Sequence, residues 1–330
     1  RLFTGLEQLS DDLGVLDGEG LWVVVLPFDA PPLCARFRRV EPAPTGRVPA
    51  APGSDWSGPA PGAWTSSLDR EAYVKAVTVV REAIAAGDVY QVNVCRRLSA
   101  PVPPDADVAA LGTALAVANP APHSALVRLR SAAVGVASAS PECFLRRRGA
   151  AVESRPIKGT APLGGAFTAK DRAENVMIVD LVRNDLGRVC EYGSVEVSSL
   201  CTPEHHPGLA HLVSTVRGRL RPGSGWADLL GATFPPGSVT GAPKLAALGM
   251  IAAVEPVPRG PYCGAVGWVD ADRRMGELNV AIRTFWLEGG MLHLGTGAGV
   301  VWESDPEAEW EETELKARRL LDVASGRLIP

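Results

Sequence analysis

One lysine, at a turn predicted from the sequence, is of a residue type that can act in catalysis. In Pro156-Ile157-Lys158-Gly159, a proline and a glycine flank Lys158, and both residues are typical of turns. Lysine is scarce here, with five lysines among the 33 Lys and Arg residues. A lysine amine can lose its proton and become a nucleophile, whereas an arginine guanidinium stays charged. Lys158 is therefore either a solvated surface residue or a catalytic amine.

Two pairs of acidic residues lie three positions apart within expected helices. The pairs are Asp171 with Glu174 and Glu309 with Glu312, and residues at i and i+3 share a helix face. Brought face to face, the two pairs would supply the oxygen ligands that Mg²⁺ prefers. The alternative is two solvated helix faces, which is the commoner situation for a single acidic pair.

Two glycine-containing segments, Gly237–Lys244 and Gly295–Gly299, invite comparison with nucleotide-binding loops. The first has the wrong spacing for a phosphate-binding loop, and no helix follows the second directly. Each segment is either a simple turn or a place where backbone N–H groups meet a carboxylate. His205, His206 and His211 lie near one another but lack cysteine partners and zinc-ligand spacing, so they predict no zinc site.

The elements that must position these residues follow no regular alternation, which favours a mixed α+β fold. A helix is expected from a capping box at Ser66–Asp69 to Gly87. Further helices are expected at 169–186, 242–254 and 304–323, and strands at 21–26, 34–40, 89–98, 125–129, 134–139, 144–148, 213–220, 264–270, 277–287 and 291–294. Gly295–Gly299 is expected to interrupt the last strand region.

Two expected strand positions carry unusual polar residues. Gln91 and Asn93 share one face of the strand 89–98, which suits either an edge strand in water or a strand lining a polar pocket. Glu142 follows Pro141 at the junction of two expected strands.

A proline-rich stretch separates the start of the chain from the rest. It predicts a short N-terminal β piece at 1–41, a Pro/Gly/Ala-rich linker at 42–65 and a main catalytic domain at 66–330. The net charge of −4 argues against a nucleic-acid partner, and no apolar run is long enough for a membrane helix. Six widely spaced cysteines predict reduced, mostly buried thiols in a cytoplasmic protein.

Several stretches taken together resemble the chorismate-utilising enzymes. They are Pro156–Thr160, Asp171–Asn175, Met177–Leu181, Arg183–Arg188, His211–Thr215, Gly237–Lys244, Tyr262–Gly267, Ile282–Thr284 and Gly297–Val301. This resemblance covers roughly residues 66–325. It implies two packed β-sheets with surrounding helices and an active site between the sheets.

Within that family, the chain resembles the aminodeoxychorismate synthase component I branch, which has lysine in the Pro-Ile-Lys-Gly-Thr motif. Anthranilate synthases typically have alanine at that position. The resemblance implies replacement of the C4 hydroxyl of chorismate by an amino group, without loss of pyruvate. It implies Lys158 as a nucleophile at C2 and Glu142 as the general acid/base. Ammonia would come from a separate glutamine amidotransferase subunit.

The resemblance also implies the remaining site residues. Mg²⁺ would be held by Glu174 and Glu312, with Asp171 and Glu309 as further ligands or water holders. The substrate-binding residues would be Gln91, His211, Ser238, Tyr262, Arg283, Gly297, Gly299 and Lys316.

Three other activities compete with this interpretation. Anthranilate synthase is the first, and Lys158 argues against it. Isochorismate or salicylate synthase is the second, but those relatives have a lysine at the position matching Gln91. The third is a chorismate-binding protein without turnover. Oligomeric state and the use of the product, in folate or in a secondary metabolite, stay open.

Overall fold

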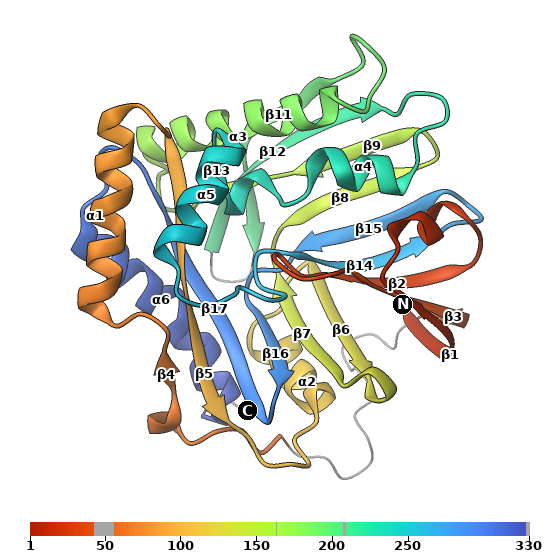
Figure 1. The fold of residues 1–330 in the computed structure, drawn as a ribbon, viewed down its shortest axis with the longest axis horizontal. Coiled ribbons are helices and arrows are strands. Elements are labelled where there is room, and N and C mark those ends of the chain that lie inside the picture. The colour runs from red at the N-terminus through yellow and green to blue at the C-terminus, as the bar shows by residue number, and fades with distance from the viewer. Residues whose placement is uncertain (43–55, 163, 207–208, 328–330) are drawn as a thin grey trace.

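The computed structural model describes residues 1–42, 56–162, 164–206 and 209–327 of the chain (Figure 1). Its helices are α1 (Arg70–Ala86), α2 (Val108–Ala118), α3 (Ala169–Gly187), α4 (Trp226–Thr233), α5 (Lys244–Val254) and α6 (Pro306–Ala324). Its strands are β1 (Leu2–Ser10), β2 (Leu21–Leu26), β3 (Leu33–Glu41), β4 (Thr65–Ser66), β5 (Gln91–Pro101), β6 (His123–Leu129), β7 (Val134–Ser140), β8 (Cys143–Arg148), β9 (Ala151–Arg155), β10 (Ile157–Pro162), β11 (Glu196–His206), β12 (Leu209–Arg219), β13 (Gly241–Ala242), β14 (Ala265–Asp270), β15 (Met275–Val280), β16 (Thr284–Glu288) and β17 (Met291–Val300).

The strands form two sheets in which every recorded pairing is antiparallel. The ten-stranded sheet runs β1-β3-β2-β14-β15-β8-β9-β12-β10, with β11 paired to β12. The seven-stranded sheet runs β13-β5-β17-β16-β7-β6, with β4 paired to β5. Two sheets with helices around them confirm the α+β class predicted from the sequence.

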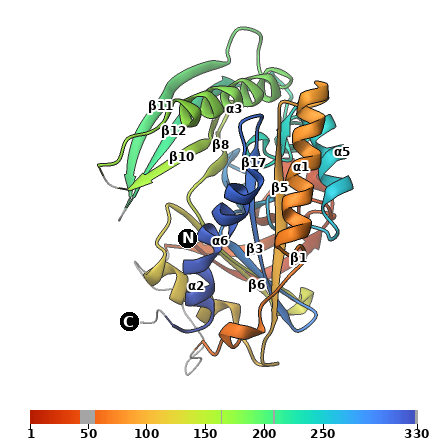
Figure 2. The ribbon, with the colours of Figure 1, turned by 90° about the vertical axis from the view of Figure 1, so that its left-hand side faces the viewer.

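The main hydrophobic core draws on both sheets. Leu145 of β8 and Leu278 of β15 come from the larger sheet, and Val136 of β7 and Trp286 of β16 from the smaller. Helix α3 packs on β10, β11 and β12, while α6 packs on β17 and α1. Figure 2 shows α3 and β10–β12 as one layer, with α1, α5 and α6 grouped around β5 and β17. Helices α3 and α6, which carry the two acidic pairs, therefore belong to different layers.

Helix α1 begins differently from the prediction. Its N-cap is Asp69, whose side chain accepts a hydrogen bond from the backbone N–H of Ala72, so the capping box expected at Ser66–Asp69 is wrong. The Ser66 hydroxyl instead donates to the backbone carbonyl of Leu68. The predicted stop is confirmed, because Gly87 adopts φ +83° as the C-cap.

The expected strand 277–287 is two strands in two different sheets. β15 lies in the larger sheet and β16 in the smaller, and the chain crosses between them at Ala281–Arg283. Arg283 has a φ of +51°, a left-handed conformation that breaks strand geometry. An alternating polar and apolar pattern does not reveal such a crossing, because both halves are strands.

The glycines of 295–299 lie inside β17 and do not interrupt it. β17 pairs with β5 without a break from Met291 to Val300. A Cβ at Gly295 would lie 2.1 Å from the Tyr262 ring, and a Cβ at Gly297 would lie 2.6 Å from Cys95 Sγ. These glycines permit close packing across the sheet rather than a turn.

Helix α2 was not predicted, because it is apolar on nearly every side and shows no amphipathic stripe. Strands β1–β3 continue the ten-stranded sheet through the pairing of β2 with β14. Most of the expected linker 42–65 lies at 43–55, outside the described residues, and the three-part division stays a prediction. All six cysteines are free and five are buried. No described helix has the length and apolar character that crossing a membrane requires.

Candidate active site

Glu142 lies in the two-residue junction between β7 and β8, only 4% exposed. Its backbone N–H donates to the Ser140 hydroxyl at 3.1 Å, and its carbonyl accepts from the Val280 N–H at 3.0 Å. Burial raises the pKa of Glu142 from 4.5 to about 7, against the opposing effects of Ser238, Lys158 and the Ile157 backbone. A carboxyl with this pKa exchanges a proton near neutral pH.

Lys158, on β10, lies beside Gln91 and Gly299. A Cβ at Gly299 would fall 2.6 Å from Gln91 Nε2 and 3.2 Å from Lys158 Nζ, so only glycine leaves both groups in place. Gln91 is buried, and its Oε1 has no hydrogen-bond partner among the described residues. β5 is paired on both sides, by β13 and β17, so Gln91 faces an enclosed polar region and not an open edge.

Acidic side chains of α3 and α6 lie on either side of Lys170. Lys170 Nζ lies 3.9 Å from Glu174 Oε1 and 4.0 Å from Glu309 Oε1, which joins the two helices. Burial raises the pKa of Glu174 and of Glu309, and the Glu312 carboxylate raises both further. Burial acts in the same direction on Glu312 itself, but Lys316, at 2.6 Å, and Lys158 hold its pKa below the ordinary value.

Asp171 has a structural task at this site. Its Oδ2 accepts from the Thr168 N–H at 2.8 Å and from the Thr168 hydroxyl at 2.7 Å, which forms the capping box of α3. Its side chain also lies against Gly159, where a Cβ would approach Asp171 Cβ to 2.9 Å. Asp171 thereby connects the start of α3 to β10, where Lys158 lies at an irregularity in the pairing with β12 and not in the turn predicted from the sequence.

These oxygen donors have the chemistry of a magnesium site. The raised pKa values of Glu174 and Glu309 arise partly from Glu312, so a cation between them would relieve carboxylate repulsion. Among the described residues no three of the acids bring ligand atoms within 4.8 Å of one another. Lys170, which is half exposed, occupies the space between the helices and can turn outward.

Two motif residues hold the surrounding elements in place. Asn175 Nδ2 donates to the Leu212 carbonyl at 2.9 Å and its Oδ1 accepts from the Ser214 hydroxyl, which fixes α3 on β12. Lys244 Nζ donates to Asp185 Oδ2 at 2.6 Å, which ties the start of α5 to α3. Sequence reasoning gave neither residue a role, nor Lys170, because their partners lie far away along the chain.

The predicted substrate-binding residues occupy different parts of the region. His211 is buried on β12, opposite Thr160 of β10. Lys316 Nζ donates to the Gly297 carbonyl at 3.0 Å. Ser238 is buried and hydrogen-bonded with Glu142.

No hydrogen bond is recorded from Arg283 or Tyr262 to Glu142 or Ser238 among the described residues. Burial lowers the pKa of the Arg283 guanidinium, and no acidic partner is recorded for it among the described residues. A partly buried cation without a recorded acid is suited to an anionic ligand. Tyr262 lines a separate small cavity with Cys95, Arg96 and Arg259.

A larger cavity, of about 710 Å³, contains none of the candidate catalytic or metal-ligand residues. It is lined by Tyr90, Arg172, Ala173, Val176, Met177, Asp180, Leu181, Ala242 and Pro243. Tyr90 and Ala173 directly precede Gln91 and Glu174 in the chain. This cavity lies between α3 and the residue that precedes β5, and Tyr90 at its edge is exposed whereas Gln91 is buried.

The chain was compared with known protein families, and the result agrees with the residues found at this site. The chorismate binding enzyme family matches the chain over residues 34–322. The chain belongs to this family. The family predicted from the sequence motifs is thereby confirmed.

Individual members of the chorismate binding enzyme family include two different activities. Anthranilate synthase component 1 of Streptomyces coelicolor is 40% identical over 270 residues, which cover 78% of this chain and 52% of that protein. Aminodeoxychorismate synthase component 1 of Escherichia coli is 41% identical over 270 residues, which cover 78% and 58%. The crystal structure of anthranilate synthase component I from Streptococcus pneumoniae TIGR4 matches with a TM-score of 0.78 at 26% identity, covering 92% and 81%. The chain spans between half and three fifths of the two curated relatives.

Proposed function

We propose that this chain aminates chorismate at C4, as aminodeoxychorismate synthase component I, with Lys158 as the nucleophile. The position of Lys158 carries the proposal. Its positive charge lowers the pKa of Glu142, of Glu174 and of Glu312. An amine among three catalytic or metal-ligand candidates supports a chemical role over that of a solvated surface lysine.

The proposed reaction uses Lys158 and Glu142 together. The Lys158 ammonium first gives a proton to solvent, and the amine then forms a bond to C2 of chorismate while the C4 hydroxyl leaves. Glu142 donates its proton to the departing oxygen, which leaves as water. Ammonia then bonds to C4, expels the lysine from C2, and returns a proton to Glu142. The net reaction consumes ammonia and releases water.

The dianionic substrate needs cationic and N–H partners. Arg283 has no recorded acid partner among the described residues and is available to a carboxylate. The backbone of Gly297 and Gly299, with Lys316 beside it, forms a second anchor. Glu174 and Glu312, with Glu309 and Asp171 near them, would hold Mg²⁺, which would supply positive charge for the ring carboxylate.

Ammonia delivery requires a further component in this proposal. A separate glutamine amidotransferase subunit supplies ammonia, and ammonium salts replace it in vitro. The unpaired Oε1 of Gln91, beside Lys158, provides an acceptor for an N–H of the incoming ammonia.

One incubation tests this function. Purified protein is mixed with chorismate, Mg²⁺ and ammonium chloride, and the products are separated and identified by mass spectrometry. We expect an amino product that retains the enolpyruvyl group. Release of pyruvate together with anthranilate would show that the chain is an anthranilate synthase instead. Formation of isochorismate would indicate that water is added, and unchanged chorismate would indicate binding without turnover.

A further inference from the structure

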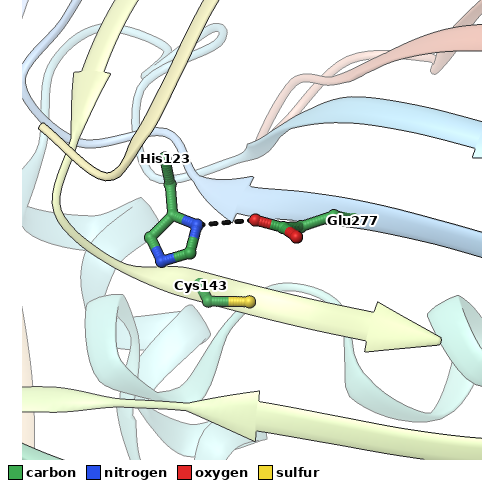
Figure 3. A group of neighbouring side chains, drawn as sticks. All are labelled: His123, Cys143 and Glu277. Carbon is green, nitrogen blue, oxygen red and sulfur yellow. Dashed lines mark hydrogen bonds and ion pairs between the residues drawn. The ribbon is translucent and has the colours of Figure 1, made fainter. Parts of the chain in front are cut away.

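A second group of ligand-type side chains lies away from the acidic helices. His123 of β6, Cys143 of β8 and Glu277 of β15 bring their ligand atoms within 4.8 Å of one another. Figure 3 shows the His123 ring and the Glu277 carboxylate pointing toward each other, with the Cys143 sulfur alongside. His123 Nδ1 lies 2.7 Å from Glu277 Oε1. It is the one such group of three among the described residues.

The donor types favour a particular ion. A nitrogen, a sulfur and a carboxylate oxygen suit Zn²⁺, whereas Mg²⁺ prefers oxygen alone. Three protein ligands leave a fourth tetrahedral position for water. Cys143 is 1% exposed, but the Glu277 side chain is 28% exposed, so an ion can enter past Glu277.

We propose that His123, Cys143 and Glu277 form a zinc site. The ion binds a His123 ring nitrogen, the Cys143 thiolate and Glu277 Oε1, and replaces the His123–Glu277 hydrogen bond. Binding releases the Cys143 thiol proton, and one ring nitrogen of His123 binds the ion while the other carries a proton. The two negative ligands balance the ion's charge.

Arg146 fits this arrangement. Its Nε donates to Glu277 Oε2 at 2.9 Å, which orients the carboxylate and leaves Oε1 for the ion. Its Nη1 pairs with Glu153 Oε1 at 2.9 Å, so the Arg146 charge is itself compensated.

The position of the site gives it a structural consequence. β6 belongs to the seven-stranded sheet, while β8 and β15 belong to the ten-stranded sheet. Zinc there fastens the two sheets together. Cys143 directly follows Glu142, so the same ion anchors the strand end that carries the proposed general acid.

The test measures zinc on the whole chain. Protein stripped with a chelator is loaded with Zn²⁺, passed through a desalting column and assayed by elemental mass spectrometry. We expect about one zinc per chain, and Co²⁺ loading should produce a thiolate-to-cobalt charge-transfer band in the near ultraviolet. Excess Mg²⁺ should displace neither ion.

Matched variants separate this site from others. Cys143→Ser and Glu277→Gln should lose the retained zinc, and Cys143→Ser should lose the cobalt band. Cys190→Ser removes a buried thiol outside the group and should keep both, as should Glu312→Gln. Circular dichroism identifies any variant that fails to fold, and Glu277→Gln preserves side-chain shape. Parent protein without retained zinc, or a Cys143→Ser variant with the parent's cobalt band, would overturn the site.

Discussion

The two sides of the proposed active site both contain buried glutamates, but their neighbours differ. On the β7–β8 side, burial alone raises the pKa of Glu142, and each neighbouring group opposes that rise. On the α3–α6 side, burial and the Glu312 carboxylate together raise the pKa of Glu174 and Glu309. A solitary buried carboxyl retains a proton, whereas crowded carboxylates attract a cation.

This difference divides the chemical work. The Glu142 backbone N–H donates to the Ser140 hydroxyl and its carbonyl accepts from the Val280 N–H, so the backbone that carries this carboxyl is fixed. The α3–α6 side is lined by Lys170 and Lys316, which are about half exposed and can move when a metal and an anionic substrate arrive. Lys158 lies between the two sides and interacts with both.

The largest expected effect on the rate comes from removing the ionisable carboxyl of Glu142, on the β7–β8 side of the site. Glu142→Gln should lower the rate of chorismate amination by about 10²–10⁴-fold, the range for loss of a general acid/base. The measurement is kcat with saturating ammonium. Glu82→Gln, an exposed change on α1, serves as the control and should leave kcat unchanged. An unchanged rate in Glu142→Gln would show that hydroxyl departure needs no acid here.

Removing a carboxylate on the α3–α6 side should instead change the metal requirement. Glu312→Gln should weaken activation by Mg²⁺ by about 10–100-fold, as expected for groups around a metal site. Glu311→Gln, on the exposed face of the same helix, is the matched control. Activity is measured against Mg²⁺ concentration for the three proteins. Full turnover of the parent in excess EDTA would contradict the metal assignment.

The same Glu142→Gln change should stabilise the fold in a pH-dependent manner. Folding raises the pKa of Glu142 from 4.5 to about 7, so the folded state binds the proton more tightly and loses stability as pH rises between these values. The full difference is about 3 kcal/mol above pH 7. Urea unfolding at pH 5 and pH 8 should show a larger gain for the variant at pH 8. Equal gains at both pH values would mean that Glu142 is already ionised in the folded protein.

Local patterns predicted most of the fold. Apolar alternation located β2, β3, β7 and β8 within one or two residues, and helices α3 and α6 had clear boundaries. The polar face of Gln91 and Asn93 left open an edge strand in water or a strand lining a pocket, and the burial of both residues favours the second. These successes rest on periodicity and capping, which depend on neighbours in the chain.

The remainder depends on contacts between distant residues. Spacing placed Glu174 and Glu309 on helix faces, but only the fold shows that Lys170 links them. The crossing at Arg283 rests on a single left-handed residue, which no periodic pattern reveals. His123, Cys143 and Glu277 come together from three strands of two sheets, so no local motif marks them.

A smaller effect, a trace of a second product, is expected from a change at Gln91, which lies beside Lys158. Gln91→Lys places an amine next to Lys158 and Gly299, where it can act as a base toward water. We expect a trace of isochorismate from chorismate and Mg²⁺ without ammonium, detected by chromatography against the parent protein. Gln91→Met keeps the side-chain length without a base and is the control. The same amount of isochorismate from both variants would show that the new lysine does not act as a base.

The product of a Lys158 variant tests the central claim most directly. Lys158→Ala, Lys158→Arg and the exposed control Lys75→Ala are each given chorismate, Mg²⁺ and ammonium, and the 4-amino and 2-amino products are quantified by mass spectrometry. A lysine bonded at C2 excludes ammonia from that carbon. We therefore predict that both Lys158 variants make the 4-amino product at least roughly tenfold more slowly, that Lys158→Ala also forms some 2-amino isomer, and that Lys75→Ala matches the parent. Formation of the 4-amino product by Lys158→Ala at the parent rate, without the 2-amino isomer, would contradict the covalent role of Lys158.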